Sequence, residues 1–246
     1  MPTLRHRPAC ALWALSLLAV SHPSAARADS TERQFWPEFN AYIRIDDRRR
    51  LMLAAAATRA RESDTDNGQR SIQDVQLTVN FDYTLPPLLQ GDMPSAEWIA
   101  QRRLWTRLGF EYGRSVGSAS SDFTSYTGIA ELNARHALDA SAWLTGRVRV
   151  DLRDINGEPS QRYRLRAGAE WSTSAFAHPI DPYGSIEFVY DTRYSQWSRL
   201  VLKAGLETPI ATGWRLEPYV ELQLNRPDDD LTRVLGLGLT LKAHFH

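Results

Sequence analysis

Residues 214–225 read W-R-L-E-P-Y-V-E-L-Q-L-N, and this segment decides the fold class. Every second residue from Trp214 to Leu224 is apolar, while the residues between them are charged or polar, with one tyrosine. Successive side chains of a strand point to opposite faces, so the segment predicts a strand with one apolar and one charged face. The apolar face would form the core of a soluble sheet, or would contact lipid in a transmembrane barrel whose charged face lines the interior.

The same alternation recurs along the chain and predicts about eleven strands with almost no helix. The alanines at 54–57 suggest a helix by propensity, but their alternating neighbours favour a strand. Asn156-Gly157 is a strong hairpin-turn dipeptide. The predicted strands lie at residues 34–45, 51–57, 72–85, 103–113, 123–135, 142–153, 162–171, 185–193, 199–207, 214–225 and 235–245.

This rhythm favours an all-β, antiparallel transmembrane β-barrel. Single-chain bacterial barrels usually have an even number of strands, so we expect about 12, with about 10 as the alternative. The strand that restores an even count could lie in residues 86–99 or 172–184, or the N-terminal segment could itself cross.

The N-terminus has the pattern of a secretory signal peptide. Arg5 and Arg7 flank His6 in a basic start, residues 9–20 are apolar, and residues 26–28 (A-R-A) fit the cleavage rule. We expect residues 1–28 to be the signal peptide and 29–246 the barrel domain, located in the outer membrane of a Gram-negative bacterium. The alternative for this segment is a short buried helix. The single cysteine, Cys10, lies inside the segment, so the mature chain cannot use thiol chemistry.

Composition narrows the partners. The 246 residues carry a formal net charge of +0, which gives no overall attraction to nucleic acid. We expect outer-membrane lipid, the barrel assembly machinery and small solutes as partners. The final strand is similar to the C-terminal recognition signal of outer-membrane proteins, although Phe245 is penultimate and not last. Aromatic residues recur near strand ends, where interfacial girdles lie: Phe35, Tyr83, Tyr112, Trp171, Tyr190, Trp214 and Phe245.

The charged faces supply the candidate site, because in a barrel they line the lumen. Their charges could form a neutralised plug or line a narrow, porin-like pore, and the arginine ladder at 162, 164 and 166 could favour anionic solutes. The lumen-lining candidates are Arg103, Arg107, Glu111, Arg147, Arg149, Asp151, Arg162, Arg164, Arg166, Glu170, Glu187, Lys203, Glu217 and Glu221.

The first predicted hairpin carries a family resemblance. Residues 34–38 (Q-F-W-P-E), then Ala41-Tyr42, a tight turn and the alternating Leu51, Leu53 and Ala55, resemble a family of exported proteins labelled domain of unknown function 2490. The resemblance implies an outer-membrane barrel and supplies no activity or functional residues.

Other functions have weaker support. A lipid-modifying outer-membrane enzyme needs a nucleophile with a positioned base, and no such motif surrounds the mature histidines at 136, 178, 244 and 246. Asp64, Asp66 and Asn67 resemble a calcium loop only faintly, so we expect no metal site. We also expect no cofactor and no catalytic residue. A soluble periplasmic barrel that binds a ligand, and an adhesion role for the loops near Asp64 and Asp228, remain alternatives.

Overall fold

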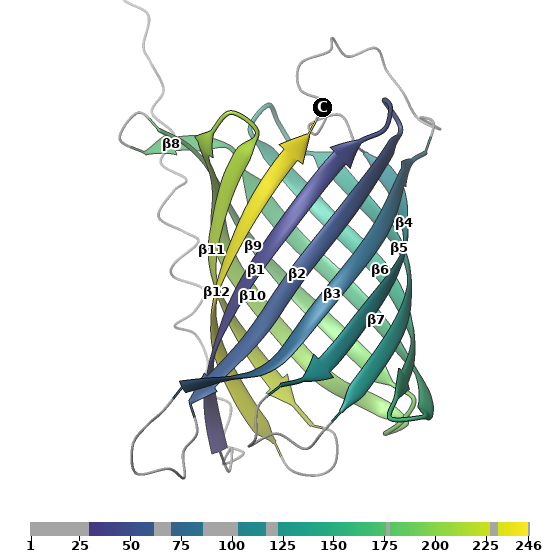
Figure 1. The fold of residues 1–246 in the computed structure, drawn as a ribbon. Helices are drawn as coiled ribbons and strands as arrows, with labels where there is room; N and C mark the ends of the chain where they lie inside the picture. The colour runs from purple at the N-terminus through teal and green to yellow at the C-terminus, as the bar shows by residue number, and fades with distance from the viewer. Residues whose placement is uncertain are drawn as a thin grey trace, which may run out of the picture.

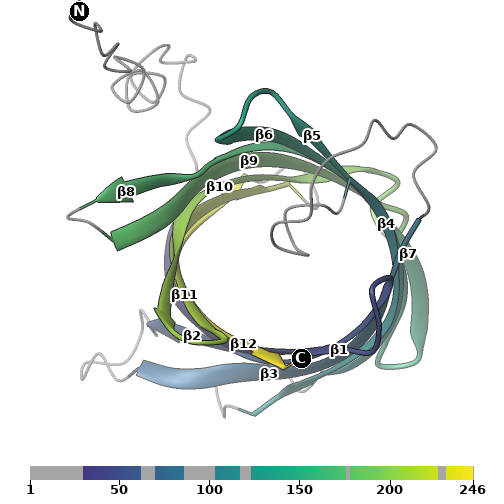
Figure 2. The same cartoon turned by 90° about the horizontal axis from the view of Figure 1, so that it is seen from above.

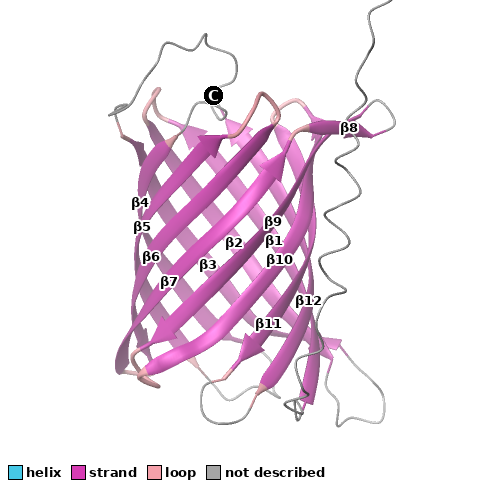
Figure 3. Cartoon of the chain, turned by 180° about the vertical axis from the view of Figure 1, so that it is seen from behind, coloured by secondary structure: helices cyan, strands magenta, loops and turns pink. Residues whose placement is uncertain are grey.

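A computed structural model describes residues 30–61, 70–85, 103–116, 123–175, 178–226 and 231–245. These residues form strands joined by turns, and no helix among them is long and apolar enough to cross a membrane (Figure 3). The strands are β1 (Ser30–Arg44), β2 (Arg49–Arg61), β3 (Arg70–Thr84), β4 (Leu104–Ser115), β5 (Thr124–Ala137), β6 (Ala142–Ile155), β7 (Glu158–Trp171), β8 (Thr173–Ala175), β9 (His178–Asp191), β10 (Gln196–Ala211), β11 (Trp214–Asn225) and β12 (Thr232–Phe245).

Eleven of these strands close into one barrel, and the short β8 pairs with the first three residues of β9, His178 to Ile180 (Figure 1). Neighbours along the chain pair antiparallel, and β7 pairs directly with β9. The barrel closes between β1 and β12, which run parallel in a continuous register from Ser30↔Thr232 to Ile43↔Phe245. Seen along its axis, the wall is a complete ring (Figure 2).

The structure confirms the predicted all-β barrel of about 12 strands and corrects its details. The predicted strands are all present, including the alanine segment 54–57, which lies within β2. The wall is odd-numbered, so the alternative of ten strands is wrong. Of the two places proposed for a further strand, 172–184 contains β8 and the first half of β9, whereas 86–99 lies outside the described residues. β9 begins at His178, seven residues before the predicted start at Ser185. The prediction missed its first half because Pro179 and Pro182 are typical of a loop.

The alternation expected in each strand is visible in its burial. Along β12, residues on one face are buried from Val234 to Thr240, while Leu235, Leu237 and Leu239 on the other face are 44%, 57% and 39% exposed. The exposed positions of the other barrel strands are likewise mostly apolar, for example Leu77 and Leu108. The barrel therefore has an apolar outer face, and its polar residues point inward.

Glycines on the inner face of β12 make room for aromatic rings beside the closing seam. A Cβ at Gly236 would lie 1.7 Å from Cζ3 of Trp36 on β1, and one at Gly238 would lie 1.9 Å from Cζ of Tyr219 on β11. The planes of the two rings are nearly parallel, inclined by 19°, and their centroids are 6.5 Å apart. The rings thus lie flat against β12 and cover the backbone where three strands meet.

Two turns have the sequence chemistry their geometry requires. The β6–β7 hairpin turns through Asn156 and Gly157, with φ of 56° and 84°, the pair of positive values that a type I′ turn needs. The β1–β2 turn is held by Asp46, whose carboxylate accepts hydrogen bonds from the backbone N–H of Arg48 at 2.9 Å and of Arg49 at 2.8 Å.

Candidate functional site: the charged inner wall

The inner face of the barrel brings most of the predicted lumen residues into one ion-pair network. Glu187 on β9 is its most connected carboxylate and is 1% exposed. It accepts hydrogen bonds from Nε of Arg164 at 2.7 Å and Nε of Arg166 at 2.8 Å, both on β7, and from Arg147 on β6. One buried carboxylate therefore holds three guanidinium groups from two neighbouring strands.

Asp151 on β6 has the same role in the neighbouring row, and none of its side chain is exposed. It accepts a hydrogen bond from Nε of Arg162 at 2.7 Å and another from Arg149, and Nη1 of Arg164 lies 3.9 Å from its carboxylate. Arg164 thus bridges Asp151 and Glu187, which joins the two rows.

The network continues to β2 through the predicted Arg107 and through three residues outside the predicted set, Glu131, Asp82 and Arg50. Glu131 on β5 lies 3.3 Å from Arg107 and 3.6 Å from Arg147. Arg107 also donates to Asp82 on β3 at 2.7 Å, and Asp82 accepts a 2.6 Å hydrogen bond from Arg50 on β2. A continuous chain of opposite charges therefore follows the wall from β2 to β9.

A second cluster lies on β10, β11 and β12. Glu217 is 3.1 Å from Nζ of Lys203 and 2.7 Å from Nζ of Lys242, and it accepts a hydrogen bond from Tyr183 on β9. Lys203 also lies 3.6 Å from the ring centroid of Tyr219, and Lys242 pairs with Glu207.

These ion pairs run along the wall. Every pair described above joins residues on the same strand, on adjacent strands or on strands separated by one other, such as Arg147 on β6 and Glu187 on β9. Among the described residues, no ion pair joins opposite sides of the ring. The network thus braces the wall, in contrast to the plug of cross-lumen pairs that the sequence left open.

The remaining predicted residues lie outside these clusters. Glu170 pairs with Arg135 at 2.8 Å. Glu111 accepts a hydrogen bond from Thr78 at 3.4 Å, and Glu221 accepts one from Gln223 at 2.8 Å. Arg103 precedes β4 and is exposed, so it lies at the rim and outside the network.

Several network residues were absent from the predicted set although their sequence carried the signal. Asp82, Glu131 and Asp191 occupy inward positions of alternating strands, and Lys242 stands between Leu241 and Ala243 on the inner face of β12. The alternation places such residues on the inner face, but it does not show which partner each will meet. Arg50, at the start of β2, lacks even this signal because it follows other arginines.

Two carboxylates outside the long strands show how the turns are stabilised. Hydrogen bonds from the Arg49 side chain and the Arg48 backbone lower the pKa of Asp46 to about 2. Asp139, in the β5–β6 turn, has its pKa lowered by hydrogen bonds from the backbone and side chain of Ser141. Both act as charged turn acceptors.

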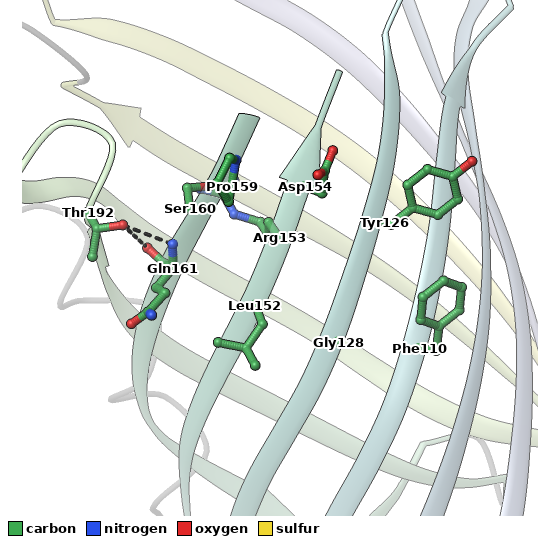
Figure 4. Close-up of a pocket in the computed structure, with 10 residues that line it drawn as sticks. All are labelled: Phe110, Tyr126, Gly128, Leu152, Arg153, Asp154, Pro159, Ser160, Gln161 and Thr192. Carbon is green, nitrogen blue, oxygen red and sulfur yellow. Dashed lines mark hydrogen bonds between the residues drawn. The ribbon is translucent and has the colours of Figure 1, made fainter. Parts of the chain in front are cut away.

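A hollow of about 720 Å³ lies where β4 to β7 approach the end of the barrel that holds the β6–β7 turn (Figure 4). Gly128 leaves a gap between Tyr126 on one side and Leu152 on the other, and a hydrogen-bonded pair, Gln161 and Thr192, forms its edge. No histidine lines this hollow.

Three of the four histidines considered as a catalytic base, His136, His178 and His244, lie in the described part of the chain. No histidine there is hydrogen-bonded to a serine, and His244 stacks on Tyr42 with ring centroids 4.9 Å apart. No group of three or more His, Cys, Asp or Glu among these residues is arranged to hold a metal ion. The faint calcium pattern at residues 64–67 lies outside the described residues.

Comparison with known proteins adds no family. No protein-family model matches the chain, and no curated protein matches it. The similarity of the first hairpin to domain of unknown function 2490 stays a prediction.

Proposed function

We propose that this protein is an outer-membrane β-barrel whose lumen is a narrow channel for small charged solutes. Three features support a membrane location. The eleven wall strands have 12 to 16 residues each, more than the roughly 9–11 that a tilted strand needs to cross a bilayer. Their outer faces are apolar and exposed, and residues 1–28 read as an export signal.

The exposed apolar belt is the strongest of these three. Monomeric soluble proteins rarely expose apolar patches larger than a few hundred Å². Here Leu77, Leu108, Leu152 and Leu237, on four different strands, are each 57–62% exposed. In a soluble periplasmic barrel this surface would contact water, whereas in a membrane the hydrocarbon of the lipids would cover it.

The observation that carries the channel proposal is the direction of the ion pairs. Barrels of eight strands are just filled by their side chains, and those of 16 to 18 hold an aqueous channel. Eleven strands fall between these sizes. Because the paired charges follow the wall and no pair spans the ring in the described residues, the interior is lined by them and not bridged.

A filled structural barrel is the second candidate, and the complete burial of Asp82, Asp151 and Glu187 favours it. The two candidates share a fold and a location and differ in conduction.

Reconstitution in planar bilayers separates them. The mature chain is refolded in detergent, and a gel of heated and unheated samples verifies the fold by its mobility shift. We expect small, discrete current steps from folded protein. A folded sample that stays silent at every voltage contradicts the channel, and lipid turnover by the same sample would favour the enzyme. A processed chain that stays soluble without detergent after cell fractionation contradicts the membrane location.

A further inference from the structure

The charges of the inner wall are unevenly distributed, although the whole chain is neutral. In one sector, the rows of β6, β7, β9 and β10 that lie level with residues 147–153 of β6, seven arginines stand against three carboxylates, an excess of four positive charges. We call it the arginine sector. Its carboxylates are Asp151, Glu187 and Asp191, and its cations are Arg147, Arg149, Arg153, Arg162, Arg164, Arg166 and Arg199.

The rows beyond the sector on the same strands carry Glu170, Asp181, Lys203 and Glu207, and each of these pairs with a residue outside the sector. Toward β2 the network adds Arg107 and Arg50, and it adds an equal number of carboxylates, Glu131 and Asp82. The three carboxylates of the sector are almost completely buried. Asp151 and Glu187 each contact three guanidinium groups, and Asp191 contacts that of Arg153. The three carboxylates of the sector therefore do not neutralise its seven arginines.

The register places like charges directly opposite one another. Arg147 faces Arg166, and Arg149 faces Arg164, in consecutive inward rows of the β6–β7 pair. Like charges directly opposite across a strand pair are destabilising. Two such rows side by side make sense where a further negative charge shares the site.

The guanidinium groups also keep hydrogen-bonding capacity. Each has five N–H donors in a planar fork that fits carboxylate and phosphate oxygens. Nε of Arg147 and Nε of Arg153 are buried without a hydrogen-bond partner. The side chains of Arg162, Arg164 and Arg166 are 18%, 20% and 29% exposed, so this region of the sector is open to a solute.

Arg199 is the most informative member. It lies on β10 opposite Asn225 of β11 and Val189 of β9, and it makes no ion pair in the described part of the chain. Its charge is repelled by Arg164 and Arg153, and the carboxylates of Glu221 and Glu187 attract it only from beyond ion-pair distance. An arginine that adds repulsion without contacting a carboxylate has a physical reason to be there if an anion binds.

We propose that the arginine sector is a binding site for a soluble oxyanion with two or more negative charges, of the phosphate or carboxylate type. A divalent or more highly charged oxyanion would match the excess charge and could accept bidentate hydrogen bonds from several forks at once. A monovalent halide could do neither. The sector faces away from the apolar belt, so the anion would come from water and not from a lipid headgroup. This inference rests on the proposed function only in that the solute must reach the lumen.

Binding can be measured in detergent solution, where conduction plays no role. Calorimetry of the folded chain with pyrophosphate and with citrate, against a constant chloride background, identifies the chemistry of the anion. We expect at least one of the two to bind, and to raise the temperature at which the folded gel band is lost. Affinity should fall as salt concentration rises.

Variants of matched chemistry test the location. Arg199→Gln removes a sector charge without breaking an ion pair, and Arg135→Gln removes a lumen arginine that pairs with Glu170 outside the sector. We expect a loss of affinity of roughly three- to ten-fold for Arg199→Gln and more than ten-fold for the Arg166→Gln/Arg199→Gln double variant. Arg135→Gln should stay within about two-fold of the parent. If Arg199→Gln does not fold, Arg199→Lys keeps the charge and should lose less.

The possible results separate this inference from the channel proposal. Binding that depends on the sector, in a barrel that stays silent in bilayers, supports the site and contradicts the channel. A conducting barrel that binds neither anion, or whose binding is weakened equally by Arg135→Gln, overturns the site and leaves the channel standing.

Discussion

Replacing Asp82 with asparagine tests the view that the ion-pair network holds the barrel wall together. The side chain of Asp82 is completely buried on β3, between Arg50 of β2 and Arg107 of β4. Its carboxylate accepts hydrogen bonds of 2.6 and 3.0 Å from Arg50 and of 2.7 and 3.2 Å from Arg107. The amide of asparagine has almost the same volume, so the change preserves packing while it removes the charge and replaces one acceptor oxygen with an NH2 donor.

The expected effect is large because two buried cations lose their shared counter-charge. Removing one partner of a buried ion pair costs about 3–5 kcal/mol. Arg107 keeps its contact with Glu131, which argues for the lower half of this range. With a urea dependence of about 1–3 kcal/mol per M, the unfolding midpoint should fall by roughly 1–4 M.

The assay is urea unfolding of the refolded barrel in lipid vesicles, followed by tryptophan fluorescence and by the fraction of the heat-shifted gel band. Asp47→Asn is the matched control, because the side chain of Asp47 is 88% exposed where it pairs with Arg44. We expect no measurable shift of the midpoint for this control. A midpoint for Asp82→Asn within about 0.3 M of the parent would refute the reasoning, since the loss of a decisive buried ion pair must lower stability by more than that.

Three further predictions concern other regions of the molecule. Gly236→Ala should destabilise the barrel by about 1–3 kcal/mol, because its Cβ would meet the indole of Trp36 at 1.7 Å. In a Trp36→Ala background the same change should cost much less stability, and a double-mutant cycle of urea unfolding measures the difference. Lys242→Met should lower the urea midpoint as strongly as Asp82→Asn, because it leaves the charges of Glu207 and Glu217 without this cation; a variant as stable as the parent would contradict the cluster. Asp46→Ala should be less stable than the parent at neutral pH, and the difference should disappear as the pH falls from about 4 to about 2. The pKa of Asp46 is lowered to about 2 in the folded chain. Its contribution to stability is therefore fully present at a pH above the pKa of the unfolded chain, and it is lost as the pH falls through the folded pKa. A stability difference that persists at a pH well below about 2 would contradict this account.

Alternation identified the strands and their faces because it is a local property of the sequence. It placed the apolar residues of 214–225 outside and Glu217 inside, and Asn156-Gly157 marked a turn of the expected type. The number of strands in the wall could not be derived from the local sequence pattern. Pro179 and Pro182 hid the first half of β9, and the parallel pairing of the first and last strands depends on the closed ring.

The candidate site was predictable as a list of inward charges but not as a network. Arg147 and Glu187 are 40 residues apart and meet across two strand interfaces, so their contact depends on the register of both. A shift of one residue in either strand would turn a whole face outward. Local sequence thus shows that Asp82 points inward, and only the assembled wall shows that it lies between two arginines.

The parallel pairing of β1 with β12 has a consequence for biogenesis. Its partners are about 200 residues apart in the chain, whereas every other wall strand finds its neighbour through a nearby connection. The ring should therefore be completed last, after the intervening hairpins have assembled. Until that moment the curved sheet has two bare edges, and each is a template for a strand of another molecule. Any helper that shields those edges would act on this intermediate.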